Sequence, residues 1–302
     1  MFGPVGERIV EDHPIFGKFT PFLGHRQDYV DWIGMRYKSD WWTELPAPRR
    51  PRLDEEYFEW IDLLEAVVEA EDRFTMLELG AGFGRWGIRG ALAAKQRGIR
   101  QIAVRFVEGE PQHAAWIREA VELNGLGDIA CGIFEAAISY SAARVPFALA
   151  PDGFDARSSW GQSATCDDQG RADFSSWRDS EPTGRTYFGL PVRRAYDTDL
   201  IQVAGITFEG LTADLDFIDF VDMEIQGSEA ELIEHAISTF DTKVGLVHIG
   251  THAVSVEDKI RTIFRNHGWT SRWDFSTQGK RETPFGPITF GDGIQAWRNP
   301  RL

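Results

Sequence analysis

The alternation of apolar and polar positions predicts strands separated by helices over most of this chain. Short apolar runs predict strands at 74–79, 102–107, 129–134, 217–223 and 244–249. Two further runs, 269–275 and 293–299, predict a final pair of strands. Strands that alternate with helices favour a parallel sheet with crossover connections, so we expect an α/β fold.

Helix-spaced apolar positions fill the stretches between these runs. A helix is expected over 85–97, and another begins near Pro111 and stops around Asn124. Ser228 with Glu231 has the spacing of a capping box, and Ser255 with Asp258 suggests a second, weaker cap. The last of these helices is expected to end at Gly268.

The turn after the first predicted strand carries the clearest chemical signal. Gly80, Gly82 and Gly84 alternate behind an acidic residue, Glu78, and a helical segment follows at once. Glycines allow a sharp turn and a close approach of backbone to ligand. A carboxylate there would repel a pyrophosphate but attract an ammonium group, such as that of the methionine end of S-adenosylmethionine.

The second predicted strand ends in another carboxylate, Glu108. Nucleotide-binding βαβ units place an acidic residue about twenty residues after the glycine turn, where it accepts hydrogen bonds from ribose hydroxyls. Taken alone, Glu108 is equally well explained as a solvated acid at a strand end. Together with Glu78 and the glycines, it is predicted to bind a ribose.

Three blocks of sequence resemble the class I S-adenosylmethionine-dependent methyltransferases of the FkbM type: 78–84, 107–111 and 217–229. The resemblance implies a doubly wound, Rossmann-like, seven-stranded sheet with an antiparallel edge pair. It implies O-methylation of a hydroxyl on a small molecule or sugar, and it places Glu135 and Ala136, just past the third strand, against the adenine.

The third block departs from the family pattern at three positions. Asp222 stands where the family usually has lysine, Glu224 where it has aspartate, and Gln226 where it has glutamate. These changes leave the predicted fold unaltered. They leave open which residues would act in catalysis.

The candidate catalytic residues follow the fourth and fifth predicted strands. His252 is the candidate base because imidazole titrates near neutrality, and Glu224 could orient it, act as a base, or bind a metal ion. Glu224 and His252, with Gln226 or Glu229, would suit Mg²⁺, Mn²⁺ or Zn²⁺, although no ligand spacing demands a metal. Arg36, in the aromatic-rich N-terminal segment, could meet the carboxylate of the cofactor.

The composition narrows the classes of partner. The formal net charge of −15 and a pI near 4.9 disfavour nucleic acid as a substrate. No apolar run approaches the roughly 20 residues of a membrane span, and no signal-type N-terminus is seen. Cys131 and Cys166 lack metal-type spacing and are expected to be free thiols. We therefore expect a soluble, cytoplasmic protein.

Two segments fall outside the regular pattern. Residues 1–52 form an aromatic-rich arm that could be a lid over the cofactor, a packing arm or a contact for self-association, and 53–302 form the main domain. Within it, 151–191 is expected to be an irregular, substrate-side insertion. Alternatives to O-methylation are N-methylation, an NAD-dependent oxidoreductase, and a non-catalytic binding protein that keeps the methyltransferase fold.

Overall fold

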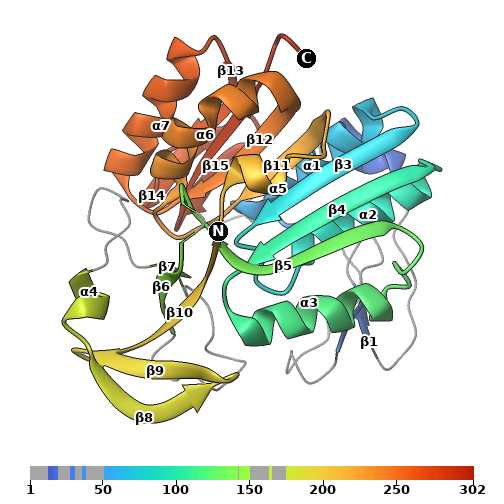
Figure 1. Ribbon diagram of the computed structural model, residues 1–302. Helices are drawn as coiled ribbons and strands as arrows, with labels where there is room; N and C mark the ends of the chain where they lie inside the picture. Colours follow the sequence, from blue (N-terminus) through green and yellow to red (C-terminus); the bar gives the residue numbers. More distant parts are fainter. Residues whose placement is uncertain are drawn as a thin grey trace, which may run out of the picture.

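The computed structural model describes residues 13–19, 28–30, 36–38, 51–141, 143–149, 163–164 and 175–302. Its centre is a twisted sheet with helices on both faces (Figure 1). None of the described helices is both long and apolar enough to cross a membrane.

Seven strands of this sheet make up the predicted doubly wound core. Their order across the sheet is β5 (Ala130–Ile138), β4 (Gln101–Glu108), β3 (Arg73–Leu79), β11 (Ile218–Met223), β12 (Val244–Thr251), β16 (Gly293–Arg298) and β13 (Thr270–Phe275). The first five strands in this order, β5, β4, β3, β11 and β12, pair in parallel. β16 pairs antiparallel with both β12 and β13. The predicted α/β fold with an antiparallel edge pair is therefore confirmed.

The strand order reverses direction between β3 and β11. From β3 the chain moves outward through β4 to β5, and it then returns to the other side of β3 as β11. Open α/β sheets bind ligands beyond the carboxyl ends of the strands at such a switch point. The glycine turn after β3 lies at this place.

Two sets of helices cover the two faces of the sheet. One face carries α1 (Glu56–Glu69), α2 (Arg85–Gln96) and α3 (Pro111–Leu123). The opposite face carries α5 (Phe208–Leu211), α6 (Glu229–Lys243) and α7 (Val254–Asn266). Because side chains alternate along a strand, Met76 and Phe220 pack on the first layer, while Leu77 and Val221 pack on the second.

The sheet continues beyond β5 through an extension that the sequence pattern did not predict. β10 (Thr198–Ile206) pairs in parallel with β5 and antiparallel with two further strands, β6 (Val145–Ala148) and β9 (Leu190–Ala195). Two short elements, β7 (Ser163–Ala164) and α4 (Ser175–Arg178), and the outer strand β8 (Glu181–Tyr187) complete it. The continuous sheet thus has 12 strands.

The segment 151–191 is expected from the sequence to be irregular. From residue 175 onward the structure contradicts this expectation, because the chain forms regular strands there. β8 forms an antiparallel hairpin with β9, yet only Tyr187 of its seven residues is buried. A strand that is exposed on both faces has no apolar alternation for a sequence pattern to detect. In the same region Phe147 of β6 would lie 2.6 Å from a Cβ at Gly109, so the extension borders the residue that follows Glu108.

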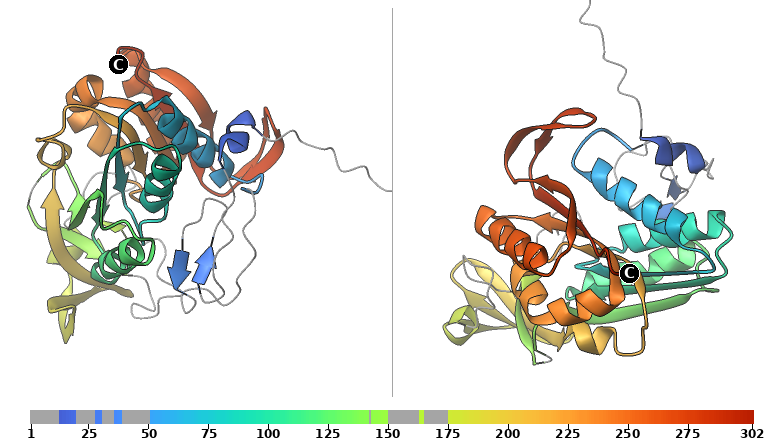
Figure 2. Two further views of the ribbon diagram at one scale, coloured as in Figure 1. Left: turned by 90° about the vertical axis from the view of Figure 1, so that its right-hand side faces the viewer. Right: turned by 90° about the horizontal axis from the view of Figure 1, so that it is seen from above.

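A second unpredicted hairpin consists of β14 (Gly279–Thr283) and β15 (Gly286–Phe290). Figure 2 shows it standing away from the main sheet beside α1. Ile288 and Phe290 pack against Phe58 of α1 in a small separate core. This packing fixes the turn that leads into β16.

The two predicted caps do not form, although the helices begin nearly where expected. Ser228 precedes α6 without a capping hydrogen bond from its side chain, and α7 follows Ala253, which has no capping side chain. The carboxylate of Glu229 instead accepts hydrogen bonds from the backbone N–H groups of Ile225 and Gly227, at 3.1 and 3.0 Å. The first residue of α6 therefore stabilises the loop that precedes the helix.

Little of the N-terminal arm belongs to the described residues. A 3-10 helix, η1 (Pro14–Lys18), packs Phe16 on Tyr57, and β1 (Asp28–Val30) pairs antiparallel with β2 (Arg36–Lys38). The side chain of Arg36 lies outside the described part of the structure. The lid, packing and self-association interpretations of the arm all stay predictions.

Candidate functional site

The glycine turn after β3 needs its glycines for two different reasons. Gly80, Gly82 and Gly84 all have left-handed backbone conformations, with φ of +79°, +54° and +77°. A Cβ at Gly80 would lie 2.0 Å from the backbone oxygen of Glu224, whereas a Cβ at Gly82 would meet no atom of the described residues within 4 Å. Gly80 thus allows two backbone segments to touch, and Gly82 faces open space where a ligand can approach.

Glu78 is directed into the N-terminus of α2. Its carboxylate is buried and accepts hydrogen bonds from the backbone N–H groups of Trp86 and Gly87, at 3.1 and 2.7 Å. Burial raises its pKa well above the ordinary value, and the nearby charge of Asp222 raises it further. Glu78 therefore stabilises the helix that follows the turn, and its predicted contact with an ammonium group stays a prediction.

Glu108 bridges the glycine turn and the start of α3. It accepts hydrogen bonds from the backbone N–H groups of Gly82 and Glu110, both at 2.7 Å. Burial raises the pKa of Glu108 to about 8 despite these donors. The carboxylate thus lies beside the open face of Gly82, where the sequence predicts a ribose ligand.

The two predicted adenine contacts lie inside a strand rather than beyond its end. Pairing with β10 extends β5 to Ile138, so the expectation that the strand stops near Phe134 is wrong. Glu135 is exposed and forms an ion pair with Arg118 at 2.9 Å, while Ala136 is buried. Contact of either residue with an adenine stays a prediction.

A cleft of about 230 Å³ opens at the carboxyl ends of β11 and β12, next to the glycine turn. Its lining is mostly acidic: Glu55, Glu56, Glu59, Asp222, Glu224 and Asp292, together with Arg85, His248, Gly250, Gly293 and Ile294. Arg85 pairs with Glu56 at 2.8 Å. The carboxylates outnumber the cationic groups, so the cleft favours a cationic occupant.

Polar side chains form a row across the sheet beneath this cleft. Asp222 of β11 is in register with Glu78 of β3 on one side and with His248 of β12 on the other. The ring Nδ1 of His248 lies 2.7 Å from the buried carboxylate of Asp62 on α1. That carboxylate also accepts a hydrogen bond from the indole N–H of Trp273 at 2.9 Å. His248 is thus a packed, hydrogen-bonded residue of the strand.

Asp222 meets a second carboxyl group, that of Glu59, from α1. Burial and the charge of Asp222 raise the pKa of Glu59 well above its ordinary value. Burial also raises the pKa of Asp222, although the hydrogen bond with Glu59 and the charge of His248 oppose the shift. Two buried acids that share a site in this way favour a state in which one proton lies between them. Such a pair can accept or release a proton during a reaction.

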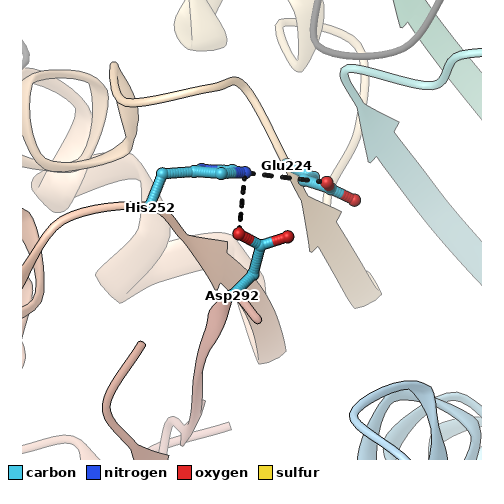
Figure 3. Close-up of side chains that lie close together, drawn as sticks. All are labelled: Glu224, His252 and Asp292. Carbon is cyan, nitrogen blue, oxygen red and sulfur yellow. Dashed lines mark ion pairs between the residues drawn. The ribbon is translucent and has the colours of Figure 1, made fainter. Parts of the chain in front are cut away.

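His252 stands among three carboxylates at the end of β12 (Figure 3). Its Nε2 atom is 3.8 Å from Glu224 and 3.8 Å from Asp292, and its Nδ1 atom is 3.8 Å from Glu229. Burial lowers the pKa of His252, but the three carboxylates outweigh burial and raise it to about 10. The imidazole is therefore cationic at neutral pH in this arrangement, which disfavours the predicted role of general base.

The sequence interpretation did not single out two acidic residues of the cleft that belong to the candidate chemistry, Glu59 and Asp292. Asp292 lies in the turn between β15 and β16, and Glu59 lies on α1. The three residues Gly291, Asp292 and Gly293 form a Gly-Asp-Gly turn before the last strand, which was an available signal for Asp292. No local signal marks Glu59, because it faces the cleft only through the packing of α1 on the sheet.

Sequence comparison relates this chain to a protein of low sequence identity. No protein-family model matches the chain. The chain is 26% identical over 249 residues to a protein of Jannaschia sp. (strain CCS1) named "Putative methyltransferase", and the match covers 81% of this chain and 79% of that protein.

Two solved structures illustrate the likeness in fold, both at low sequence identity. A precorrin-6y C5,15-methyltransferase from Geobacter metallireducens GS-15 has a TM-score of 0.42 at 10% identity and covers 83% of this chain and 92% of its own. The methyltransferase FkbM from Methylobacillus flagellatus KT has a TM-score of 0.40 at 11% identity, covering 75% of this chain and 44% of its own. These scores add nothing to the fold that the strand order already shows.

Proposed function

We propose that this protein is an S-adenosylmethionine-dependent methyltransferase. The observation that carries the proposal is the open face of Gly82 beside the carboxylate of Glu108, at the switch point of a doubly wound sheet. The antiparallel strand pair at the sheet edge and the relative in Jannaschia support the same class of enzyme.

The residues at the switch point fit such a cofactor. Glu108 would accept hydrogen bonds from the ribose hydroxyls, and the backbone of Gly82 would lie close to the bound molecule because no side chain of the described residues lies within 4 Å of a Cβ placed there. When bound, the cofactor supplies a methyl group on a sulfonium centre. The hydrogen bond from the N–H of Glu224 to the oxygen of Leu79, at 2.9 Å, joins this turn directly to the acidic cleft.

The acceptor would occupy the acidic cleft. Holding an acceptor in line with a methyl donor supplies up to roughly 7–11 kcal/mol in favourable cases. A hydroxyl acceptor must also lose its proton, and the Glu59 and Asp222 pair lies in the cleft to receive it. We therefore propose a hydroxyl of a small molecule or sugar as the acceptor, as the FkbM resemblance implies.

An amine acceptor is the second candidate, and the charge of the cleft favours it. The six acidic residues that line the cleft would attract an ammonium group, and the Glu59 and Asp222 pair would take up its proton before transfer. Acceptor sets of small alcohols, sugars and primary amines, incubated with methyl-labelled S-adenosylmethionine, separate the two. We expect label in one set, and the Asp222→Asn variant should transfer less label while it still binds the cofactor.

Label in no set, with the cofactor bound, would favour the rival interpretation of a non-catalytic protein with the methyltransferase fold. Binding of NAD in place of S-adenosylmethionine would favour the oxidoreductase. Either result would contradict the proposal.

A further inference from the structure

We propose that Glu224, His252 and Asp292 form a binding site for one divalent metal ion. Each residue offers one ligand atom, and these three atoms lie within 4.8 Å of one another. The side chains come from three separate elements, namely the ends of β11 and β12 and the turn before β16, and they converge on one point (Figure 3). The site goes beyond the proposed methyl transfer and does not depend on it.

The orientation of the imidazole supports a metal ligand. Nε2 faces both Glu224 and Asp292, while Nδ1 faces the fully buried Glu229. Nδ1 is buried and makes no hydrogen bond among the described residues. Metal-bound histidines commonly direct their second ring nitrogen toward a carboxylate, which fixes the tautomer and leaves the other nitrogen free to bind the ion. Glu229 is in the position of that carboxylate.

The surrounding backbone holds the carboxylates in place. Glu55 of the α1 N-terminus accepts hydrogen bonds from the N–H groups of Gly291 and Asp292, at 2.8 and 3.3 Å, and so fixes the turn that carries Asp292. A Cβ at Gly250 would lie 3.1 Å from the side chain of Glu224, so the glycine leaves room for that carboxylate. The side chains of Glu224 and Asp292 are 51% and 49% exposed, so an ion can reach them from the cleft.

The donor set indicates the class of ion. Two carboxylates and one imidazole suit Mg²⁺, Mn²⁺ or Zn²⁺, and no sulfur ligand is present in the cluster. A divalent ion would balance the charge of the two carboxylates, and it would displace the proton from Nε2 of His252, which is cationic in the metal-free arrangement. If the cleft binds a hydroxyl acceptor, as proposed above, a metal ion there would also lower the pKa of that hydroxyl.

The test uses Mn²⁺ as the probe, because its electron paramagnetic resonance signal reports both free ion and bound nitrogen ligands. The chelator-treated full-length protein is titrated with Mn²⁺ and compared with two ligand variants, His252→Ala and Asp292→Asn. The exposed residues His235 and Asp197 supply matched controls, His235→Ala and Asp197→Asn. Circular dichroism confirms that each variant is folded.

We expect one Mn²⁺ per wild-type chain, with a nitrogen coupling from the imidazole in the electron spin echo signal. Asp292→Asn should weaken binding at least about tenfold and keep the nitrogen coupling, whereas His252→Ala should lose that coupling. The controls should bind like the wild type. The proposal is overturned if folded wild-type protein binds no Mn²⁺, or if His252→Ala binds it with unchanged affinity and coupling.

Calorimetric titration of the same chelator-treated samples with S-adenosylhomocysteine keeps the two proposals apart. Absence of Mn²⁺ binding by the wild-type protein, with intact cofactor binding, would refute the metal site alone. Mn²⁺ binding without any cofactor binding would support the metal site and refute the proposed function.

Discussion

Substituting alanine at Gly80 or at Gly82 should separate the structural role of the turn from its ligand-binding role. Both glycines have left-handed backbone conformations, so either substitution carries the same type of backbone penalty, about 1–2 kcal/mol. What differs is the space around the added methyl group. At Gly80 it would collide with the backbone of Glu224, whereas at Gly82 it would meet no other part of the described structure within 4 Å.

The close contact at Gly80 predicts that Gly80→Ala destabilises the protein more than Gly82→Ala does. A Cβ placed 2.0 Å from the oxygen of Glu224 and 3.2 Å from Ile225 must displace the end of β11. The 2.9 Å hydrogen bond from the N–H of Glu224 to Leu79 would be lost in the process, at about 0.5–1.5 kcal/mol. With repacking, Gly80→Ala should lower the free energy of unfolding by roughly 3 kcal/mol or more, and Gly82→Ala by only about 1–2 kcal/mol.

In folded protein, Gly82→Ala should reduce cofactor affinity more than Gly80→Ala does. Urea denaturation followed by circular dichroism gives the stabilities, and calorimetric titration with S-adenosylhomocysteine gives the affinities. Gly82→Ala should remain folded and lose most of its affinity, because its methyl group occupies the space beside Glu108. Wild-type affinity in a folded Gly82→Ala protein would refute the placement of the cofactor.

Three further predictions concern buried carboxylates. Glu108→Ala should weaken cofactor binding about ten- to hundredfold in calorimetry, since a charge-assisted hydrogen bond is worth roughly 1.5–3 kcal/mol; unchanged affinity would contradict the ribose role. Asp62→Ala leaves His248 without its buried partner and should cost about 3–5 kcal/mol in urea denaturation, whereas Asp72→Ala, from an exposed pair, should cost under about 1 kcal/mol; equal losses would contradict this account. The folded state raises the pKa of Asp222 above its ordinary value of 3.8, so it binds more protons than the unfolded state and loses stability as pH rises from about 4 through the raised pKa. Asp222→Asn should therefore gain stability relative to the wild type between pH 4 and 7, and a pH-independent difference would show that the raised pKa is wrong.

The sequence predicted the core of the fold because its signals are local. The run before Gly80 and the run that ends at Glu108 are strongly apolar and terminate in turn residues, and both became parallel strands with the expected bounds to within one residue. The predicted site residues lie at, or just past, the carboxyl ends of such strands: Glu78, Glu108, Glu224 and His252. Their place at one edge of the sheet follows from the parallel topology alone.

The remaining features depend on contacts between distant segments. Asp292 reaches the cluster because Glu55, more than two hundred residues away in the chain, holds its turn. Glu59 faces Asp222 only once α1 is packed on the sheet. Only one of the seven residues of the hairpin strand β8 is buried, so its pairing with β9 leaves no apolar pattern in the sequence.

The turn after β3 is the proposed binding site for S-adenosylmethionine. Calorimetric titration of the purified protein with S-adenosylmethionine, S-adenosylhomocysteine and NAD in parallel tests it most directly. We predict that the two methionine-derived compounds bind with one site per chain and that NAD does not bind. Binding of NAD, or of none of the three, by the folded protein would contradict the account.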